Sequence, residues 1–463
     1  MSLSQPDSII TTLAQWSATL RYRAIAPEAL AVAQRCVIDT LGVALAGSGS
    51  PVAQRARAVA MMTAGPGHSS LIGASAACCA PAAAFVNATA GHALDFDDNC
   101  NAGFVHGSVV IAPAALAVAQ MGDLPGERLL AAFVAGAECE YALAQALTRR
   151  VYDQGWWTTA LFGAVGACAA ACHGLGLDAA QTAAAMAIAL AGGSGLKAGF
   201  GTDAKPLMAG RASEAGVVAA LLAQQGCSGP IDIVEQPRGL AAMFCGQPAA
   251  PVTGLGQGWR LLAPGVDIKR IPVCMSSHAA VDALVDLMAA HGLSAASIAE
   301  VVCDVPAIVM QNLAHEVPES PQHAQFSMNF ALACTAVTGE LTLASLAQAT
   351  LDDPRIQQLM RRVRMHSSER WNAALNDTAP EGAWVKVLTV DGRTFERFCA
   401  RHQGSASQPM PHSALRGKFL GCAGMALPAI EANALLHRLE HLPHLPSTRA
   451  LLHSPNAHPG PTP

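Results

Sequence analysis

Two long stretches without a charged residue, 154–177 and 179–196, constrain most strongly what this chain can fold into. Each stretch is long enough to cross a bilayer as a helix. Together they are built from alanine, glycine, cysteine, threonine and serine, whereas a membrane span is normally dominated by leucine, isoleucine, phenylalanine and valine. We therefore predict that they form buried helices of a tightly packed soluble bundle.

The overall composition excludes two classes of protein. Hydrophobic residues make up 52% and charged residues 13% of the 463 residues, so the chain has ample apolar surface to bury and is not intrinsically disordered. The formal net charge of −5 does not provide the basic surface that a nucleic-acid binder needs. No lysine or arginine precedes Arg21, so the basic region of a signal peptide is missing and we expect a cytoplasmic protein.

The 14 cysteines mostly stand alone in apolar runs, and no CxxC occurs. One close group of ligand-type residues falls on a single predicted helix face: Cys168, Cys172 and His173. A zinc site would need a fourth ligand, so we interpret this group as core residues. A second group lies near the C-terminus and is interpreted as a solvated helix end: His437, His441 and His444. We expect no metal and, in a reducing compartment, no disulfide.

The first half of the chain has apolar residues at helical spacing. We expect helices at 27–42, 82–94, 109–120, 131–147, 158–177, 179–190 and 206–225, the third of them capped by Ser108. The pattern changes near Pro264. Residues 298–305 form a short segment that is rich in β-forming residues. Residues 384–399 predict a β-hairpin, because Asp391-Gly392 separates two runs of alternating apolar and polar residues.

Helical segments at 279–291 and 326–337 accompany these strands, so residues 265–401 predict a smaller α+β unit. The chain returns to helix from about 413 to 441, and the last twenty or so residues are expected to be loose. The prediction is a mainly α protein with three segments: 1–264 as the first part of a helical domain, 265–401 as the α+β unit, and 402–463 as a C-terminal helical part with a loose tail.

Because charge is scarce, three charged clusters are the candidates for chemistry. In the first, three carboxylates fall within four residues and are followed by His106: Asp95, Asp97 and Asp98. Like charges this close repel one another, so they need a cation, a metal or backbone donors. His106 precedes an expected helix and titrates near neutrality, which makes it a candidate acid or base. The alternative is an acidic turn on the surface.

In the second cluster, a glycine-rich approach places Lys205 at a helix N-terminus, with Arg211 further along. This favours a carboxylate ligand, because the glycine spacing matches neither a phosphate loop nor a dinucleotide fingerprint. The third cluster, Lys269 and Arg270, lies with His278 at the predicted boundary between units, where ligand sites are common. The alternative for the second cluster is an exposed loop with a solvated lysine, and the alternative for the third cluster is a basic hinge loop in solvent. With no G-x-S-x-G and no HExxH, the clusters favour chemistry through a carbanion next to a carboxylate.

At these positions the sequence resembles the MmgE/PrpD family, whose members include dehydratases, decarboxylases and epimerases of small carboxylic acids. The motifs follow one another along nearly the whole chain: Asp39-Thr-Leu-Gly-Val-Ala, His92-Ala-Leu-Asp-Phe-Asp-Asp98, His106-x-Ser108, Gly201-Thr-x-x-Lys205-Pro-Leu, Gly210-Arg-Ala-Ser-Glu-Ala-Gly216, Lys269-x-x-Pro272 with His278, and Phe326-Ser327. The resemblance implies one large all-helical domain built from both chain ends, an inserted smaller α+β lid domain, and a homodimer.

The resemblance also implies an active site between the domains. Lys205 and Lys269 would hold carboxylates of a small carboxylic-acid substrate, His106 would move the proton, and Asp95 would orient or hydrogen-bond. No metal and no organic cofactor is implied.

Four positions depart from the decarboxylase-like members of the family. Asn99 stands where those members have Thr, Trp157 and Met208 each stand in place of a His, and Phe330 stands in place of a Tyr. We expect these residues to line the substrate site together with Arg211, Arg270 and His278. The apolar replacements lead to the hypothesis that the pocket accepts a less polar substrate, or one with fewer carboxylates.

Three functions remain open from the sequence. The leading one is a lyase that dehydrates or decarboxylates a small polycarboxylate. An isomerase that epimerises a small dicarboxylate would use the same deprotonation and return the proton. A non-catalytic binding or scaffold protein is the third, because the family His and Tyr are missing. The joint presence of Asp95, His106, Lys205 and Lys269 favours the two enzymes.

Overall fold

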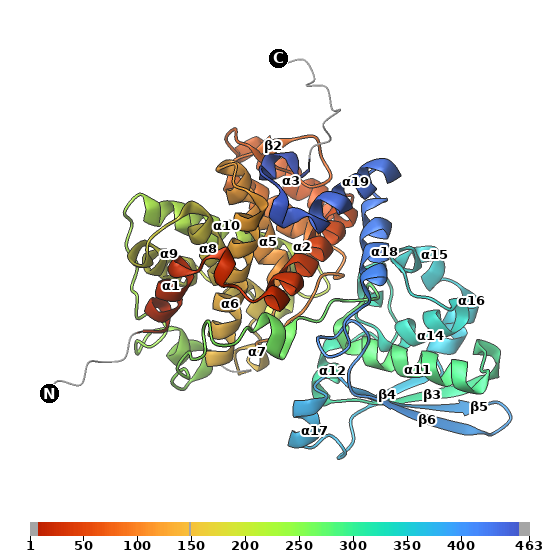
Figure 1. Ribbon diagram of the computed structural model, residues 1–463. Coiled ribbons are helices and arrows are strands. Elements are labelled where there is room, and N and C mark those ends of the chain that lie inside the picture. Colours follow the sequence, from red (N-terminus) through yellow and green to blue (C-terminus); the bar gives the residue numbers. More distant parts are fainter. Residues whose placement is uncertain (1–7, 148–149, 453–463) are drawn as a thin grey trace. The chain divides into compact units, whose positions relative to one another are not determined.

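The computed structural model describes residues 8–147 and 150–452 (Figure 1). It is 59% helical with 8% strand, which confirms the prediction of a mainly α protein. Its internal contacts divide the chain into two compact units. The first, called here the helical unit, contains the described residues up to Asp267 and those from Pro411 onward. The second, called here the α+β unit, is Ile268–Met410.

Within residues 8–147 and 150–224, the helical unit has ten α-helices: α1 (Ile9–Thr19), α2 (Pro27–Gly47), α3 (Pro51–Thr63), α4 (Ala80–His92), α5 (Gly107–Met121), α6 (Gly126–Leu147), α7 (Arg150–Asp153), α8 (Thr158–Leu175), α9 (Ala179–Ala191) and α10 (Ala204–Gln224). The antiparallel pair β1 (Ser69–Ser70) and β2 (Ala77–Cys78) precedes α4. Two short helical turns lie between these helices, η1 (Tyr22–Ala24) and η2 (Lys197–Gly199), and two more follow α10, η3 (Ala241–Cys245) and η4 (Leu261–Gly265).

Helix α8 packs against α5, α6 and α10 in the centre of the helical unit, and glycine makes this close packing possible. A Cβ on Gly136 of α6 would lie 2.6 Å from the carbonyl oxygen of Gly166 on α8. A Cβ on Gly216 of α10 would lie 2.5 Å from the backbone nitrogen of Cys168. Because neither approach leaves room for a side chain, the glycines set the distance between the helices.

Two helices, Pro27–Gly47 and Thr158–Leu175, are long and apolar enough to cross a membrane by length and composition. Their most apolar windows are 72% and 94% buried inside the protein. Helices in the core of a soluble protein pass the same test, and this degree of burial favours the predicted core role. All 14 cysteines, including Cys168 and Cys172 of α8, are free.

The structure corrects two details of the predicted helices. Helix α5 begins at Gly107 with His106 as its N-cap, and Ser108 lies wholly buried inside the first turn, so Ser108 is not the cap. The segment 413–441 is two helices, α18 (His412–Ala423) and α19 (Ala429–Glu440). Pro428 immediately precedes α19, and proline has no N–H with which to continue the preceding helix.

The expectation of a loose C-terminus is wrong for residues up to 452. Thr448 and Leu451 are completely buried, and Arg449 donates from Nε to the carbonyl oxygen of Gln120 at 2.8 Å. These contacts satisfy carbonyl groups at the end of α5, and two short turns, η8 (Leu442–His444) and η9 (Thr448–Ala450), form along them. The remaining tail, 453–463, lies outside the described residues.

The α+β unit is built on a four-stranded sheet in the order β4-β3-β5-β6. Its strands are β3 (Ile298–Asp304), β4 (Val363–His366), β5 (Ala383–Thr389) and β6 (Thr394–Cys399). Strand β3 pairs parallel with β4 and antiparallel with β5. The predicted hairpin is confirmed: β5 and β6 are antiparallel, and Gly392 in the turn has φ +82°.

Helices α11 (His278–His291) and α14 (Met328–Thr338) contact strands of this sheet and each other (Figure 1). The other helical elements of the α+β unit are short: η5 (Met275–Ser277), η6 (Ala295–Ser297), α12 (Ala307–Asn312), α13 (Pro321–Ala324), η7 (Leu343–Leu346), α15 (Gln348–Leu351), α16 (Pro354–Met360) and α17 (Ala373–Thr378). Buried and less buried residues alternate along β5, as expected for a sheet with one covered face.

Candidate active site

The loop after α4 folds back so that its acidic residues face the interior. Asp95 adopts a left-handed conformation with φ +48°, which Asp tolerates better than most residues other than glycine. Its backbone N–H donates to the carbonyl of His92 at 3.2 Å, closing a turn at the end of the helix. Asp95 is 4% exposed, and Asp97 and Asp98 are not exposed at all. The alternative of an acidic turn on the surface is therefore excluded.

Two histidines share the carboxylate of Asp97. Nδ1 of His92 lies 2.8 Å from its Oδ2, and Nδ1 of His106 lies 3.3 Å from the same oxygen. Nδ1 of His106 also faces the backbone carbonyl of Asp98 at 2.8 Å. Since both partners of this nitrogen are acceptors, we assign its hydrogen to Nδ1, which leaves Nε2 of His106 as the basic nitrogen.

The pKa values of this group follow from burial and from the shared contacts. Burial lowers the pKa of His92 to about 4, so its ring is neutral at neutral pH and donates to Asp97. Burial alone would raise the pKa of Asp97, but the neighbouring His92 and His106 outweigh it and hold this pKa well below its usual range. Asp97 is therefore a buried, ionised carboxylate beside two imidazoles.

Lys205 binds a second carboxylate of the loop, that of Asp95. Its Nζ lies 2.7 Å from Oδ1 of Asp95, and both side chains are buried. The ammonium also lies 4.9 Å from the ring centre of Phe200, where a cation is favoured. Oδ1 of Asp95 is 3.9 Å from Nε2 of His92. The side chains thus form a continuous chain of polar neighbours, in the order Lys205, Asp95, His92, Asp97 and His106.

The N-terminus of α8 supports this arrangement. Trp157 caps the helix and is 1% exposed, with its ring 5.1 Å from that of His92 and 5.9 Å from that of Phe200. The hydroxyl of Thr159 accepts a hydrogen bond from the backbone N–H of His106 at 2.9 Å. The first turn of α8 therefore holds both the ring that packs on His92 and the backbone that carries His106.

The structure brings four predicted site residues together in the helical unit: Asp95, His106, Lys205 and Trp157. It pairs them differently from a simple His–Asp couple, because the carboxylate next to His106 belongs to Asp97 while Asp95 pairs with the lysine. The backbone of Asn99 exchanges two hydrogen bonds with Asp267, at 2.9 and 2.8 Å, which ties this loop to the end of the helical unit.

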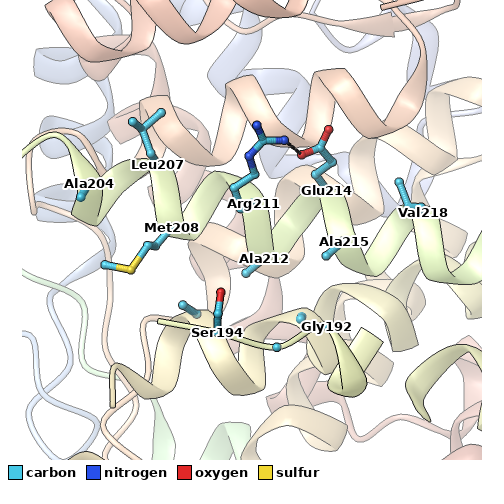
Figure 2. A pocket seen from close by; sticks show the side chains of 13 residues that line it. Gly192, Ser194, Ala204, Leu207, Met208, Arg211, Ala212, Glu214, Ala215 and Val218 are labelled. Carbon is cyan, nitrogen blue, oxygen red and sulfur yellow. Dashed lines mark hydrogen bonds and ion pairs between the residues drawn. The ribbon is translucent and has the colours of Figure 1, made fainter. Parts of the chain in front are cut away.

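Met208 and Arg211 line a separate cavity of about 610 Å³ along α8, α10 and residues 192–194 (Figure 2). Neither His106 nor Lys205 is among the residues that line it. Figure 2 shows Arg211 turned toward Glu214, with which it forms an ion pair at 2.6 Å. These two predicted substrate-binding residues therefore line a cavity whose lining does not include Lys205.

The remaining predicted residues belong to the α+β unit. Lys269 is 1% exposed, which excludes a basic hinge loop in solvent. Arg270 pairs with Asp282, and His278 lies edge-on to His402 with ring centres 5.0 Å apart. Burial, followed by His402, Lys269 and Arg270, lowers the pKa of His278 well below its usual value. This unit therefore has a basic cluster of its own. Phe330 is fully buried on α14.

Comparison with known families accounts for most of the chain. The model of the MmgE/PrpD N-terminal domain matches residues 11–252, and that of the MmgE/PrpD C-terminal domain matches residues 271–440. The chain belongs to the MmgE/PrpD family. The predicted resemblance is thereby confirmed. Lys269 and Arg270 fall between the two matched segments, while Asp95, His106 and Lys205 all lie within the N-terminal MmgE/PrpD match.

Curated relatives of this MmgE/PrpD chain are decarboxylases by name. The chain is 25% identical to the cis-aconitate decarboxylase of Mus musculus over 431 residues, 89% of this chain and 86% of the mouse protein. It is 26% identical to the cis-aconitate decarboxylase of Homo sapiens over 424 residues, covering 89% and 87%. A cis-aconitate decarboxylase-like protein of Aspergillus oryzae is 25% identical over 446 residues, covering 90% and 91%.

Sequence reasoning did not assign roles to His92 and Asp97, although both lie in a quoted family motif. The useful signal was their spacing: a histidine in the last turn of a helix, followed five residues later by an aspartate in an acidic loop. Together with His106 they place three donor atoms within 4.8 Å of one another, close enough to hold a metal ion. Both Nδ1 atoms face carboxylate or carbonyl oxygens, and this hydrogen bonding accounts for the cluster without an ion.

A second buried acidic group lies on the other side of the same loop. Burial raises the pKa of Asp98 to about 7. Ser108 and Cys36 lie close enough to lower this pKa somewhat, but neither reaches its oxygens with hydrogen-bond geometry. Asp39 of α2 adds negative charge near Asp98 and is itself paired with Lys418 of α18 at 2.6 Å. Asp98 is therefore a carboxyl group that holds its proton up to neutral pH.

Proposed function

We propose that this MmgE/PrpD protein is a lyase that removes carbon dioxide or water from a small polycarboxylate, through a carbanion next to a carboxylate and without a cofactor. The observation that carries the proposal is the pairing of Lys205 with Asp95 beside the His106–Asp97–His92 cluster. The names of the relatives, cis-aconitate decarboxylases, support the same reaction class. The proposal includes a cytoplasmic homodimer, in which the α+β unit is the lid that the family resemblance implies.

In the proposed reaction, Lys205 binds a substrate carboxylate with its ammonium group, which Asp95 holds in position. In decarboxylation, the bond between the departing carboxylate and its carbon breaks, and its electron pair remains on that carbon. The lysine stabilises the negative charge as it spreads into the neighbouring carboxylate. A protonated His106 donates its Nε2 proton to the carbon, carbon dioxide leaves, and solvent returns a proton to the ring.

Dehydration would use the same groups in a different order. His106 would take the proton next to the carboxylate as a neutral base, and the hydroxyl group would leave as water with that proton. In both reactions the ionised Asp97 stabilises the imidazolium form of His106. We propose that Lys269 binds a second carboxylate of the substrate, with Arg270 and His278 nearby.

The proposed substrate has fewer charges than a tricarboxylate. Trp157 is an apolar ring in contact distance of His92 and Phe200, at a position where decarboxylase-like family members have an imidazole. A buried indole offers a single N–H donor and no positive charge. A crystal soak with a tricarboxylate fully coordinated beside His106 and Lys205 would contradict this part of the proposal.

The test is to incubate the purified protein with a panel of C4 to C7 carboxylic acids in deuterated buffer and to follow them by NMR. Loss of carbon dioxide or water identifies a lyase, and deuterium uptake without net conversion identifies an epimerase. The His106→Ala variant should be inactive, whereas His437→Ala, at an exposed helix end, should match the wild type. The absence of any change with every acid would contradict an enzymatic function.

Binding is measured separately from turnover. Lys205→Ala should weaken the binding of a carboxylate substrate or product about 10- to 100-fold, because a charge-assisted hydrogen bond is lost. Lys386→Ala is the matched control, since Lys386 is an exposed lysine on β5 of the α+β unit. Unchanged affinity in Lys205→Ala would remove the lysine from the proposed mechanism.

A further inference from the structure

A second, smaller cavity lies at the far end of the helix that carries the candidate active site. Its volume is about 270 Å³, and it forms where the end of α1, the start of η1, the first turn of α6 and the last turn of α8 meet. Helix α8 is 18 residues long, so this end lies roughly 27 Å from the turn that carries Trp157. The cavity therefore belongs to a different place in the helical unit.

Two guanidinium groups line this cavity. Nη1 of Arg21 donates to the carbonyl oxygens of Ala18 and Leu20, and Nη2 of Arg128 donates to that of His173 at 3.3 Å. Across 8–147 and 150–452, neither arginine forms an ion pair with a carboxylate. A guanidinium has five N–H donors, so capping these carbonyls leaves donors on both groups for a ligand.

Tyr22 and His173 complete the polar lining. Burial, followed by the charge of Glu127, raises the pKa of Tyr22, so its phenol stays protonated and is a donor. His173 is 9% exposed, its Nε2 donates to the carbonyl of Leu20 at 3.1 Å, and its Nδ1 is buried without a hydrogen-bond partner. Burial lowers the pKa of His173 and outweighs the effect of the Leu20 carbonyl, and the charges of Arg128 and Arg21 lower it further.

We propose that this cavity binds a small dianion, shared between the guanidinium groups of Arg21 and Arg128. A planar guanidinium fork matches the paired oxygens of phosphate and carboxylate groups. A dianion such as phosphate or a short dicarboxylate provides four oxygens, enough for a bidentate contact with each arginine. In the part of the chain that the structure describes, neither positive charge has a carboxylate partner. The exposed Glu127, whose charge acts on Tyr22, opposes binding.

The first experiment is calorimetric titration of the full-length protein with sodium phosphate and, in a separate arm, with disodium succinate. Sodium chloride keeps the ionic strength constant, so that general screening does not produce the signal. Arg21→Gln and Arg128→Gln should each weaken binding about tenfold or more, because each removes a charge-assisted contact. Arg23→Gln is the matched control, since Arg23 is exposed, two residues from Arg21, and does not line the cavity.

Comparison of the phosphate and succinate titrations identifies the chemical class of the dianion. Binding of phosphate alone indicates a phosphate or phosphate-ester ligand, and binding of succinate alone indicates a dicarboxylate. Ala18→Phe should block either one while leaving both arginines in place, because the half-buried Ala18 lines the cavity. Arg128→Gln also loses the hydrogen bond to the carbonyl of His173 and could destabilise the fold for that reason. Ala18→Phe keeps this bond and therefore tests the cavity independently. Circular dichroism and the Tm establish folding for each variant.

The second experiment reads the cavity directly and does not depend on catalysis. A bound dianion offsets the charges of the two arginines, so the pKa of His173 should rise when phosphate or succinate is added. Histidine ring signals in NMR report this change, and His173→Gln identifies the signal. Succinate bound only at Lys205 would leave the His173 signal unmoved. The proposal is overturned if neither dianion shifts that signal, or if binding is the same in Arg21→Gln, Arg128→Gln and Arg23→Gln.

Discussion

Asp97 and Asp98 are neighbours in the chain and both are completely buried, yet they differ in ionisation. Asp97 faces Nδ1 of His92 and of His106, and these contacts hold its pKa well below the usual range. Asp98 points to the opposite side of the loop, where burial and the charges of Asp39 and Asp97 raise its pKa to about 7. One peptide unit therefore separates an ionised carboxylate from a carboxyl group that is half protonated near neutral pH.

The comparison shows that the partner, and not the depth of burial, determines the charge of a buried acid. Desolvation is the largest effect on both residues and acts in the same direction. Two imidazoles reverse it at Asp97, while a hydroxyl and a thiol without hydrogen-bond geometry do not reverse it at Asp98. The loop thus presents a negative charge to His106 and, toward α2 and α5, a carboxyl group that is half protonated near neutral pH.

The largest effect is expected for Asp97→Asn. The amide has nearly the same shape but no negative charge, so the imidazolium form of His106 loses its stabilising partner. We expect kcat to fall on the order of 10²- to 10⁴-fold with the substrate identified by the acid panel. Asp98→Asn is the matched control, because the contact from His106 to residue 98 is to the backbone carbonyl and survives the substitution. Equal losses in both variants would contradict the assigned roles.

Asp97→Asn should also change stability in a pH-dependent way. Because the folded-state pKa of Asp97 is depressed, its contribution to the free energy of unfolding is present above the unfolded-state pKa of about 3.9 and is lost as the pH falls through the folded-state value. Urea denaturation should therefore show the variant less stable than the wild type at neutral pH, with the difference shrinking in acid. A difference that stays constant with pH would show that folding does not lower the pKa of Asp97.

Asp98→Asn should have the opposite effect on stability. The folded-state pKa of Asp98, about 7, lies above the value near 3.9 of the unfolded chain, so the folded protein binds more protons in this window. The wild type therefore loses stability as the pH rises from about 4 to about 7, by up to about 4 kcal/mol, and the variant does not. Urea denaturation of both proteins across this range measures the difference. Parallel curves would mean that Asp98 is ionised throughout.

The difference between the two aspartates could not be read from the sequence. Periodicity gave the helices on both sides of the loop, and motif order gave Asp95, His106 and Lys205 as site residues. The direction of each carboxylate depends on the left-handed conformation of Asp95, and nothing in the residue type requires a positive φ there. The same limit explains the error at Ser108: a serine before an apolar run fits a cap, but the chain enters the helix one residue earlier.

A smaller effect is expected when His92 is changed. His92→Ala removes one of the two imidazoles on Asp97, so the pKa of Asp97 should rise and kcat should fall about tenfold, with the acid limb of the pH profile shifted upward. His92→Asn keeps an N–H donor near the position of Nδ1 and should restore most of the loss. A structural role alone would lower stability without moving the pH profile, and equal activity of the Ala and Asn variants would exclude the proposed contact.

The smallest effect is expected on the other side of the loop, for Ser108→Ala. Ser108 lowers the pKa of Asp98, so its removal should raise that pKa further and move the loss of stability to higher pH, by less than about one pH unit or about 1 kcal/mol. The urea series used for Asp98 measures this shift. Ser213→Ala is the control, because its buried hydroxyl donates to the carbonyl of Val110 at 2.8 Å and its loss should lower stability equally at all pH values. If Ser108→Ala behaves like this control, the hydroxyl has no influence on the pKa of Asp98, which burial and the charges of Asp39 and Asp97 then set without it.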